Sequence, residues 1–252
     1  MTAHDPGAGR PDPVRVADLA GRLEQVRTRL DAACARAARD PAEVDLLVVT
    51  KFFPAADVLA LYDLGCRAFG ESREPEAGTK ADQVRAVVDD PIAFHMIGQI
   101  QRRKARSVGR WADVVHSLDS ARLADALDVA VRTALDSGER SDLLDVLVQV
   151  NLDGAPDRGG VMPTDLDALA AAVRSKRALR LRGLMVIAPQ SSTPAMWMER
   201  AAAIRSGFLD HHPDADEFSA GMSGDLDEAV RHGSTCVRVG TAIMGARPLV
   251  SP

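Results

Sequence analysis

Strand-like and helix-like patterns alternate along most of the chain. The first strand shows this clearly, because Leu46 to Val49 is continuously aliphatic, as in a parallel strand buried on both faces. We expect strands at residues 44–50, 67–70, 92–97, 113–117, 144–151, 179–188, 217–221 and 235–240. We expect helices at residues 14–39, 55–64, 80–88, 101–109, 121–135, 166–176, 195–211 and 226–232.

This alternation predicts an α/β fold. About eight strand–helix units without a break in composition indicate a single-domain (β/α)8 TIM barrel over residues 14–252, with an extra N-terminal helix. An open doubly wound sheet is the alternative, but it typically has a glycine-rich turn after its first strand, where this chain has Lys51-Phe52-Phe53-Pro54. Residues 1–13 are polar and contain several prolines and glycines, so we expect a disordered leader there.

Charge and cysteine usage exclude some classes of protein. A net charge of −5 and a pI near 5.7 argue against a general nucleic-acid binder. Cys34, Cys66 and Cys236 lack zinc-ligand spacing, and a sparse, odd set of cysteines fits a reducing compartment. Neither a signal peptide nor a membrane-spanning stretch is recognisable, so we expect a cytoplasmic protein.

Lys51 lies where the first expected strand ends and a loop begins, because Pro54 stops the strand. In α/β barrels this edge of the sheet binds ligands. An amine half-buried beside Phe52 and Phe53 would lose proton affinity through desolvation, which suits a lysine that forms a Schiff base with a carbonyl. An ordinary surface lysine is the alternative from this segment alone.

Two glycine-containing loops follow the last two expected strands. In the first, Gly221-Met222-Ser223-Gly224 leads into a helix whose free N–H groups form an anion site, with Ser223 as a candidate cap. In the second, Gly240-Thr241 exposes backbone N–H groups at a strand end. The loops after the seventh and eighth strands of many barrels hold a phosphate, so we interpret this pair as a phosphate site. An ordinary capped helix with glycine turns also fits the first loop.

Arg238 alternates with apolar residues inside the last expected strand, so its guanidinium requires a ligand or a structural Asp or Glu partner. A strand-end lysine, a phosphate site and a buried arginine together suit pyridoxal 5′-phosphate, which has an aldehyde, a phosphate and a ring nitrogen. A sugar phosphate also fits, so this chemistry alone leaves both ligands open.

Ordered motifs between residues 44 and 247 carry a resemblance to a known family. They are VVTKFFP, FGESREPE, FHMIGQIQRRKAR, VHSLDS, VLVQVNLDGAPDRGGV, LRLRGLMVIAP and FSAGMSGDLDEAVRHGSTCVRVGTAIMGAR. In these segments the chain resembles the YggS/PROSC family of pyridoxal phosphate homeostasis proteins. The resemblance implies a fold type III barrel like the N-terminal domain of alanine racemase. It also implies a monomer that binds and buffers the cofactor and can pass it to apo-enzymes in transient contacts.

The resemblance also implies roles for particular residues. Lys51 would hold pyridoxal phosphate as a Schiff base. Ser223, Gly240 and Thr241 would hold the phosphate. Arg238 would face the pyridine nitrogen and keep it unprotonated, which makes the cofactor a weaker electron sink.

Other positions near the expected site stay open. Met222 and Met185 line the pocket or pack in the core. Ser72 stands where the family commonly has Asn, so a hydrogen bond from the amide toward the cofactor is lost or mediated by water. His95 and His116 lie on expected strands, and we favour hydrogen-bonded core histidines over ligands of the cofactor.

A basic cluster follows the third expected strand and consists of Arg102, Arg103, Lys104, Arg106 and Arg110. Such a run is usually a solvated helix face. The alternatives are that it attracts anionic pyridoxal phosphate or docks a partner protein.

The resemblance favours a carrier over an enzyme. A racemase of this kind needs a second acid/base opposite the lysine, normally a tyrosine from a partner's C-terminal domain. The one tyrosine, Tyr62, falls within an expected helix, and the expected barrel extends almost to the last residue, so we expect no second base. The alternatives are a weak racemase or lyase that uses Lys51 as its only base, a Schiff-base aldolase, or a structural interaction partner.

Overall fold

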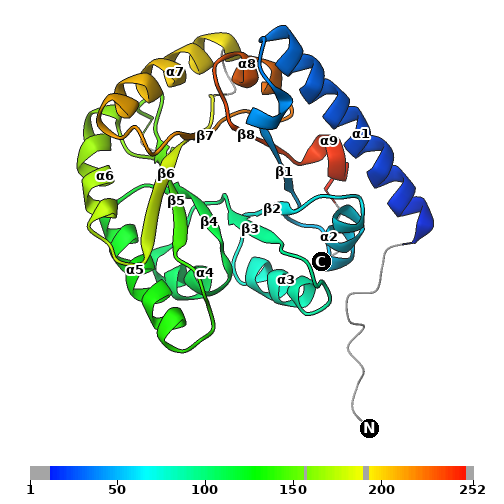
Figure 1. The fold of residues 1–252 in the computed structure, drawn as a ribbon, viewed down its shortest axis with the longest axis horizontal. Helices are drawn as coiled ribbons and strands as arrows, with labels where there is room; N and C mark the ends of the chain where they lie inside the picture. Colours follow the sequence, from blue (N-terminus) through cyan, green and yellow to red (C-terminus); the bar gives the residue numbers. More distant parts are fainter. Residues whose placement is uncertain (1–11, 156–157, 190–192, 248–252) are drawn as a thin grey trace.

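Eight parallel strands close into a barrel in which neighbours in the sequence are neighbours in the sheet (Figure 1). The computed structural model describes residues 12–155, 158–189 and 193–247. The strands are β1 (Asp45–Val49), β2 (Ala68–Glu71), β3 (Ala93–Met96), β4 (Val114–Leu118), β5 (Leu144–Val150), β6 (Leu179–Val186), β7 (Glu217–Ser219) and β8 (Cys236–Val239). The predicted TIM barrel is confirmed, and the open sheet is excluded because β1 pairs with β8.

Helices surround the barrel on the outside. They are α1 (Pro13–Arg36), α2 (Ala55–Asp63), α3 (Glu76–Arg85), α4 (Ala105–Trp111), α5 (Ala121–Asp136), α6 (Leu166–Arg174), α7 (Pro194–His211), α8 (Leu226–Arg231) and α9 (Thr241–Met244). Short 3-10 turns precede β1, α4 and α6, namely η1 (Pro41–Glu43), η2 (Arg102–Lys104) and η3 (Pro163–Asp165). No helix among the described residues is long and apolar enough to cross a membrane.

The ends of several elements differ from the sequence prediction, and one helix was not predicted. Helix α1 starts at Pro13, with Asp12 as its cap, so the end of the predicted leader belongs to the helix; residues 1–11 lie outside the described part. Helix α3 starts at Glu76, earlier than predicted, and includes Gly78. A Cβ at Gly78 would lie 2.9 Å from Trp111 Cδ1, so the close packing of α3 against Trp111 favours a glycine at this position. Helix α9 was not predicted, since so short a helix leaves no periodic pattern.

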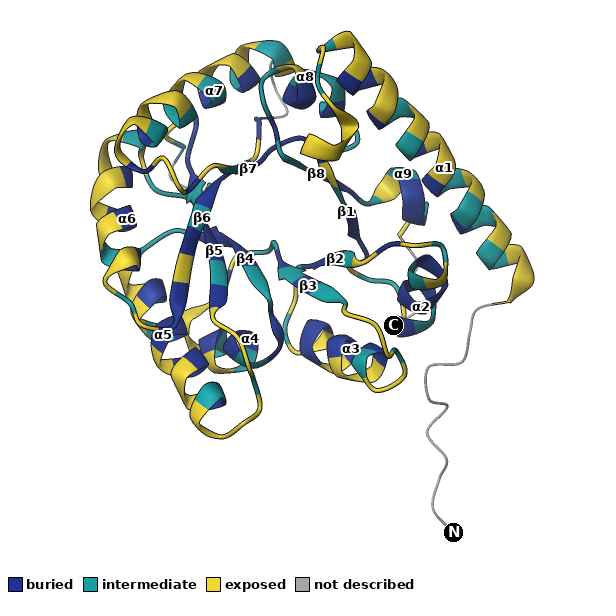
Figure 2. Ribbon diagram, viewed as in Figure 1, coloured by how far each residue is buried: buried dark blue, intermediate teal, exposed yellow. Residues whose placement is uncertain are grey.

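Along the helices around the barrel, buried residues alternate with residues exposed to solvent (Figure 2). In α5, for example, Leu123, Leu127 and Val131 recur every fourth residue and are buried. Together with the outward-facing residues of the strands, these buried residues form the main apolar core.

Side chains on neighbouring strands contact one another at several levels of the barrel. Near the amino ends of the strands, Arg182 on β6 pairs with Glu217 on β7 at 2.8 Å. Farther along, Leu47 and Val49 point inward, because a Cβ on Gly70 would contact both side chains. The carboxyl ends of the strands remain as the edge where loops build a site.

Helix α1 lies across α2, α8 and α9 rather than against a strand (Figure 1). Its buried stripe of Leu19, Leu23, Val26 and Leu30 has helical spacing. The three helices that it contacts follow β1, β7 and β8. Helix α1 therefore braces the segments from which the predicted site is built.

Candidate functional site

Lys51 begins the loop after β1, at the carboxyl edge of the barrel. Its side chain is exposed, so the expected partial burial of the amine is wrong. Phe52 and Phe53 are themselves half-buried. The centre of the Phe52 ring lies 5.9 Å from Lys51 Nζ, so the ring is near the amine but does not shield it from solvent. Phe52 has a φ of 72°, which is rare for a bulky residue and turns the loop sharply.

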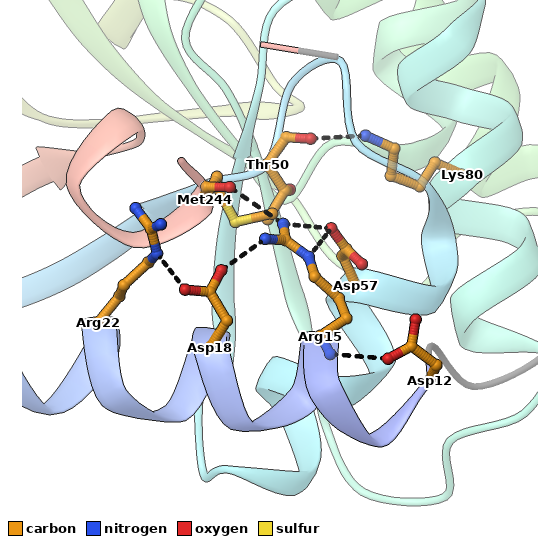
Figure 3. Close-up of polar contacts among 8 residues, drawn as sticks. All are labelled: Asp12, Arg15, Asp18, Arg22, Thr50, Asp57, Lys80 and Met244. Carbon is orange, nitrogen blue, oxygen red and sulfur yellow. Dashed lines mark hydrogen bonds and ion pairs between the residues drawn. The ribbon is translucent and has the colours of Figure 1, made fainter. Parts of the chain in front are cut away.

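A buried network holds the residue that precedes Lys51. Lys80 Nζ donates to the carbonyl oxygen of Thr50 at 2.9 Å (Figure 3) and to Glu71 Oε1 at 2.7 Å. The Thr50 hydroxyl donates to the same carboxylate oxygen at 2.7 Å. Burial raises the pKa of the Glu71 carboxyl, and the charge of Lys80 opposes that rise. The network fixes the backbone from which Lys51 projects.

Arg238 on β8 is buried, with only 4% of its surface exposed. Its Nη1 donates to Ser219 Oγ at 2.6 Å, and its Nη2 donates to the carbonyl oxygen of Val186 at 2.8 Å. No carboxylate in the described ranges lies within 4.0 Å of the guanidinium, so the structural Asp or Glu partner is not found there. Burial lowers the pKa of Arg238. A buried cation held by neutral oxygens favours a further electron-rich partner.

Ser219 connects Arg238 to two histidines inside the barrel. His116 Nδ1 lies 2.9 Å from Ser219 Oγ, and His116 Nε2 lies 2.9 Å from His95 Nδ1. Both histidines are thus hydrogen-bonded interior residues, as predicted. Burial lowers the pKa of His95 to about 4 and is the main cause of a pKa well below the ordinary value at His116. Both rings are therefore neutral at pH 7.

The loop after β7 is a closed turn. Gly221 has a φ of 91°, where a Cβ would lie 2.5 Å from Ala229 Cβ. Met222 N donates to Asp225 Oδ1 at 2.6 Å, and Asp225 N donates back to the Met222 carbonyl oxygen at 3.2 Å. Asp225 therefore closes the turn before α8, and the prediction that Ser223 caps this helix is wrong. Met222 and Ser223 are half-buried at the turn.

Two arginines of α1 hold the loops of the site. Arg29 donates to the carbonyl oxygen of Ser223 at 2.7 Å. Arg15 donates to the carbonyl oxygen of Met244, at the end of α9, at 3.0 Å and to Asp57, in the first turn of α2, at 2.7 Å (Figure 3). One helix therefore fixes the segments that follow β1, β7 and β8 relative to one another.

Strand pairing brings these segments to one place. Arg238 N donates to the carbonyl oxygen of Gly221 at 2.9 Å, which joins β8 to the loop after β7. A Cβ on Gly240 would lie 3.4 Å from Val49 Cβ, so the end of β8 lies against the end of β1. All the predicted site residues are on this edge or in the strand that reaches it: Lys51, Met222, Ser223, Arg238, Gly240 and Thr241.

The rim beside Lys51 is basic. Arg247 Cζ lies 3.9 Å from the centre of the Phe52 ring, and Arg73 Cζ lies 5.7 Å from it. These contacts gather two guanidinium groups and the Lys51 amine around a single aromatic ring. Such a rim attracts anions toward the edge of the barrel.

Other residues near the site were missed or misjudged from sequence. Glu71, Ser219 and Arg29 carry no local signal, because their partners are distant in the chain. Lys80 carries one, since it lies among buried residues of α3. Met185 is 1% exposed, as core packing requires. No group of three or more potential metal ligands occurs in the described ranges.

Comparisons with known proteins agree with this geometry. The model of the alanine racemase N-terminal domain family matches residues 22–248. A pyridoxal phosphate homeostasis protein of Mycobacterium leprae is 46% identical over 247 residues, covering 94% of this chain and 96% of the relative. Its counterpart from Escherichia coli K12 is 37% identical over 233 residues, covering 91% and 97%. The structure of PipY from Synechococcus elongatus PCC7942 with pyridoxal phosphate bound has a TM-score of 0.75 and 33% identity, covering 90% of this chain and 100% of PipY. The chain therefore belongs to the alanine racemase N-terminal domain family and, within it, to the pyridoxal phosphate homeostasis proteins.

Proposed function

We propose that this protein binds pyridoxal 5′-phosphate at the edge formed by β7, β8 and β1 and serves the homeostasis of that cofactor. The relatives named above support the cofactor and the biological role. The observation in this structure that carries the proposal is Arg238: a buried guanidinium, bonded to neutral oxygens, at the same edge as an exposed lysine amine.

The residues of the site fit each functional group of the cofactor. Pyridoxal phosphate supplies an aldehyde, with which the primary amine of Lys51 condenses to a Schiff base while water leaves. Ser223, Gly240 and Thr241 hold the phosphate through backbone N–H groups and hydroxyls, because the first amides of α9 have no acceptor within the helix. Met222 lines the pocket wall.

Arg238 decides how reactive the bound cofactor is. A guanidinium has only donors and stays protonated in proteins, so Arg238 does not supply a proton. Facing the ring nitrogen, it stabilises the unprotonated form, which withdraws electrons weakly. This arrangement suits a protein that holds its cofactor more than one that turns over amino acids.

The position of the tyrosine also favours a carrier. Tyr62 lies in α2, where its hydroxyl donates to the carbonyl oxygen of Asp90 at 3.3 Å and its ring stacks with Arg67 at 4.1 Å. These contacts engage it away from Lys51. A weak racemase or lyase with Lys51 as its only base is the alternative, and it requires measurable deuterium exchange at the Cα of an amino acid.

We further infer that the protein buffers the cofactor in the cytoplasm as a monomer and passes it to apo-enzymes in transient contacts. A reversible Schiff base suits release. The free thiols of Cys34, Cys66 and Cys236 suit a reducing compartment.

Titration with the cofactor tests the proposal. Purified protein mixed with pyridoxal phosphate should gain an absorption band in the near-ultraviolet to visible, and Lys51→Ala should not. Lys176→Ala is a matched control, since Lys176 lies between α6 and β6, at the amino ends of the strands and away from the site. An identical band in Lys51→Ala would refute the assignment of the amine.

A further inference from the structure

A second surface feature lies outside the cofactor site. A groove of about 750 Å³ runs between α4 and α5 and is lined by Arg102, Arg103, Arg106 and Arg122. All four side chains are exposed. We refer to this surface as the α4–α5 basic groove.

The positive charge of the groove is not neutralised by the protein itself. None of its four arginines pairs with a carboxylate within 4.0 Å in the part of the chain that the structure describes. Asp125, the acidic residue that lines the groove, is paired with Lys176 at 2.6 Å. Arg110 differs, because its guanidinium binds both oxygens of Asp82. Arg110 thus belongs to an ordinary solvated face, whereas the groove concentrates free positive charge on a chain of net charge −5.

The floor of the groove is apolar, and the helices beneath it are closely packed. Ala105, Ala126 and Ala130 line it, and Val129 beside them is 61% exposed. A Cβ on Gly109 would lie 2.9 Å from Ala130 Cβ, so only a glycine lets α4 and α5 pack this closely. Small side chains leave room for the apolar residues of a bound helix, while the arginines above them can meet its carboxylates.

The groove opens toward the same edge of the barrel as the cofactor site. Arg102 and Arg103 lie in η2, which follows β3, and Arg122 lies in the first turn of α5, which follows β4. In a parallel barrel these segments and the Lys51 loop all start at the carboxyl ends of the strands. A partner seated in the groove would therefore reach the same edge of the barrel as the cofactor site, from the side opposite β7 and β8 (Figure 1).

We propose that the α4–α5 basic groove docks an acidic amphipathic helix on the surface of an apo-enzyme that receives pyridoxal phosphate. This inference rests on the proposed function and adds the partner's surface to it. The arginines favour a partner that carries carboxylates. The apolar floor favours a helix over a free phosphate, because a phosphate site would need hydrogen-bond donors that enclose the ligand. Nucleic acid is disfavoured because the chain as a whole is negative.

Charge reversal tests the docking proposal. The groove variant is Arg102→Glu with Arg106→Glu. The control is Arg177→Glu with Arg200→Glu, which changes the net charge equally at exposed positions that do not line the groove. The probe is a short fluorescent helical peptide with glutamates on one face and leucines on the other. We expect it to bind wild type and control alike, to lose affinity about tenfold or more in the groove variant, and to weaken with salt.

Transfer of the cofactor supplies the second readout. Each protein is loaded with pyridoxal phosphate and mixed with a panel of purified apo-enzymes. All three should load equally, and the groove variant should activate at least one acceptor about tenfold more slowly than the control. Equal peptide binding and equal transfer by groove variant and control would overturn docking while leaving cofactor binding intact. Tighter groove-dependent binding of an RNA oligomer, or groove-dependent self-association, would also overturn it. A wild type that does not load would instead refute the proposed function.

Discussion

Arg238 donates a 2.6 Å hydrogen bond to Ser219 Oγ, and this contact joins β8 to β7 inside the barrel. The second acceptor, the Val186 carbonyl, lies on β6. The guanidinium is thus oriented by neighbouring strands before any ligand arrives, so binding requires little reorganisation. The orientation is rigid while the charge is unpaired, and both properties suit a partner such as a ring nitrogen.

Arg238→Gln should weaken binding of pyridoxal phosphate about tenfold to a hundredfold, because a hydrogen bond to a charged group is lost. The apo protein should keep its stability or gain some, since a buried, unpaired cation is removed. Absorbance titration gives the affinity, and urea unfolding gives the stability. Unchanged affinity in a folded variant would contradict a contact between Arg238 and the cofactor.

Arg29→Ala should weaken cofactor binding about threefold to tenfold, because the loop after β7 loses its attachment to α1. Arg36→Ala is the matched control: Arg36 also pairs with Asp227 but does not contact Ser223. The same titration compares the two. Equal losses in both variants would attribute the effect to Asp227 rather than to the Ser223 loop.

Lys80→Met should destabilise the protein by about 3–5 kcal/mol, because the Glu71 carboxyl stays buried without its cation. Burial raises the pKa of Glu71, and loss of the opposing Lys80 charge should raise it further, so just above the ordinary value the folded variant keeps a proton that the unfolded chain has lost. The loss of stability should therefore grow as the pH rises above the ordinary value of 4.5. Urea unfolding at about pH 5 and about pH 8 measures this. Addition of Glu71→Gln should restore much of the stability; a double variant as weak as the single one would argue against the pair.

The histidines should make stability depend on acid. The pKa of His95 is lowered from 6.5 to about 4, so between these values the unfolded chain binds a proton that the folded protein does not. Stability should fall as the pH falls through this window, by at most about 3 kcal/mol from His95. Urea unfolding of wild type and His95→Asn across this pH range isolates the contribution of His95 to stability, because the other groups titrate alike in both proteins. Parallel pH profiles would show that His95 does not stay neutral.

Much of the barrel could be predicted because its signals are local. Aliphatic strands, amphipathic helices and glycine turns fix the order of elements, and the ends of parallel strands fix the edge where ligands bind. The positions of Lys51, Ser223 and Gly240 at that edge follow from that reasoning. The exposure of Lys51 does not, because it depends on how the Phe52 turn places the ring.

Most of the site contacts that could not be predicted join residues that are far apart in the sequence. Arg29 and Ser223 are 194 residues apart, and His116 and Ser219 are 103 apart. No periodicity links such pairs. For the same reason the contacts of α1 with α2, α8 and α9 could not be predicted, and its pattern indicated only a leading helix.

The measurement that bears most directly on the central claim is the site of covalent attachment. The protein is loaded with pyridoxal phosphate, reduced with borohydride, digested and analysed by mass spectrometry. We predict one cofactor adduct on the peptide that contains Lys51, and none there in Lys51→Ala. An adduct mainly on another lysine, such as Lys80 or Lys104, would contradict the account.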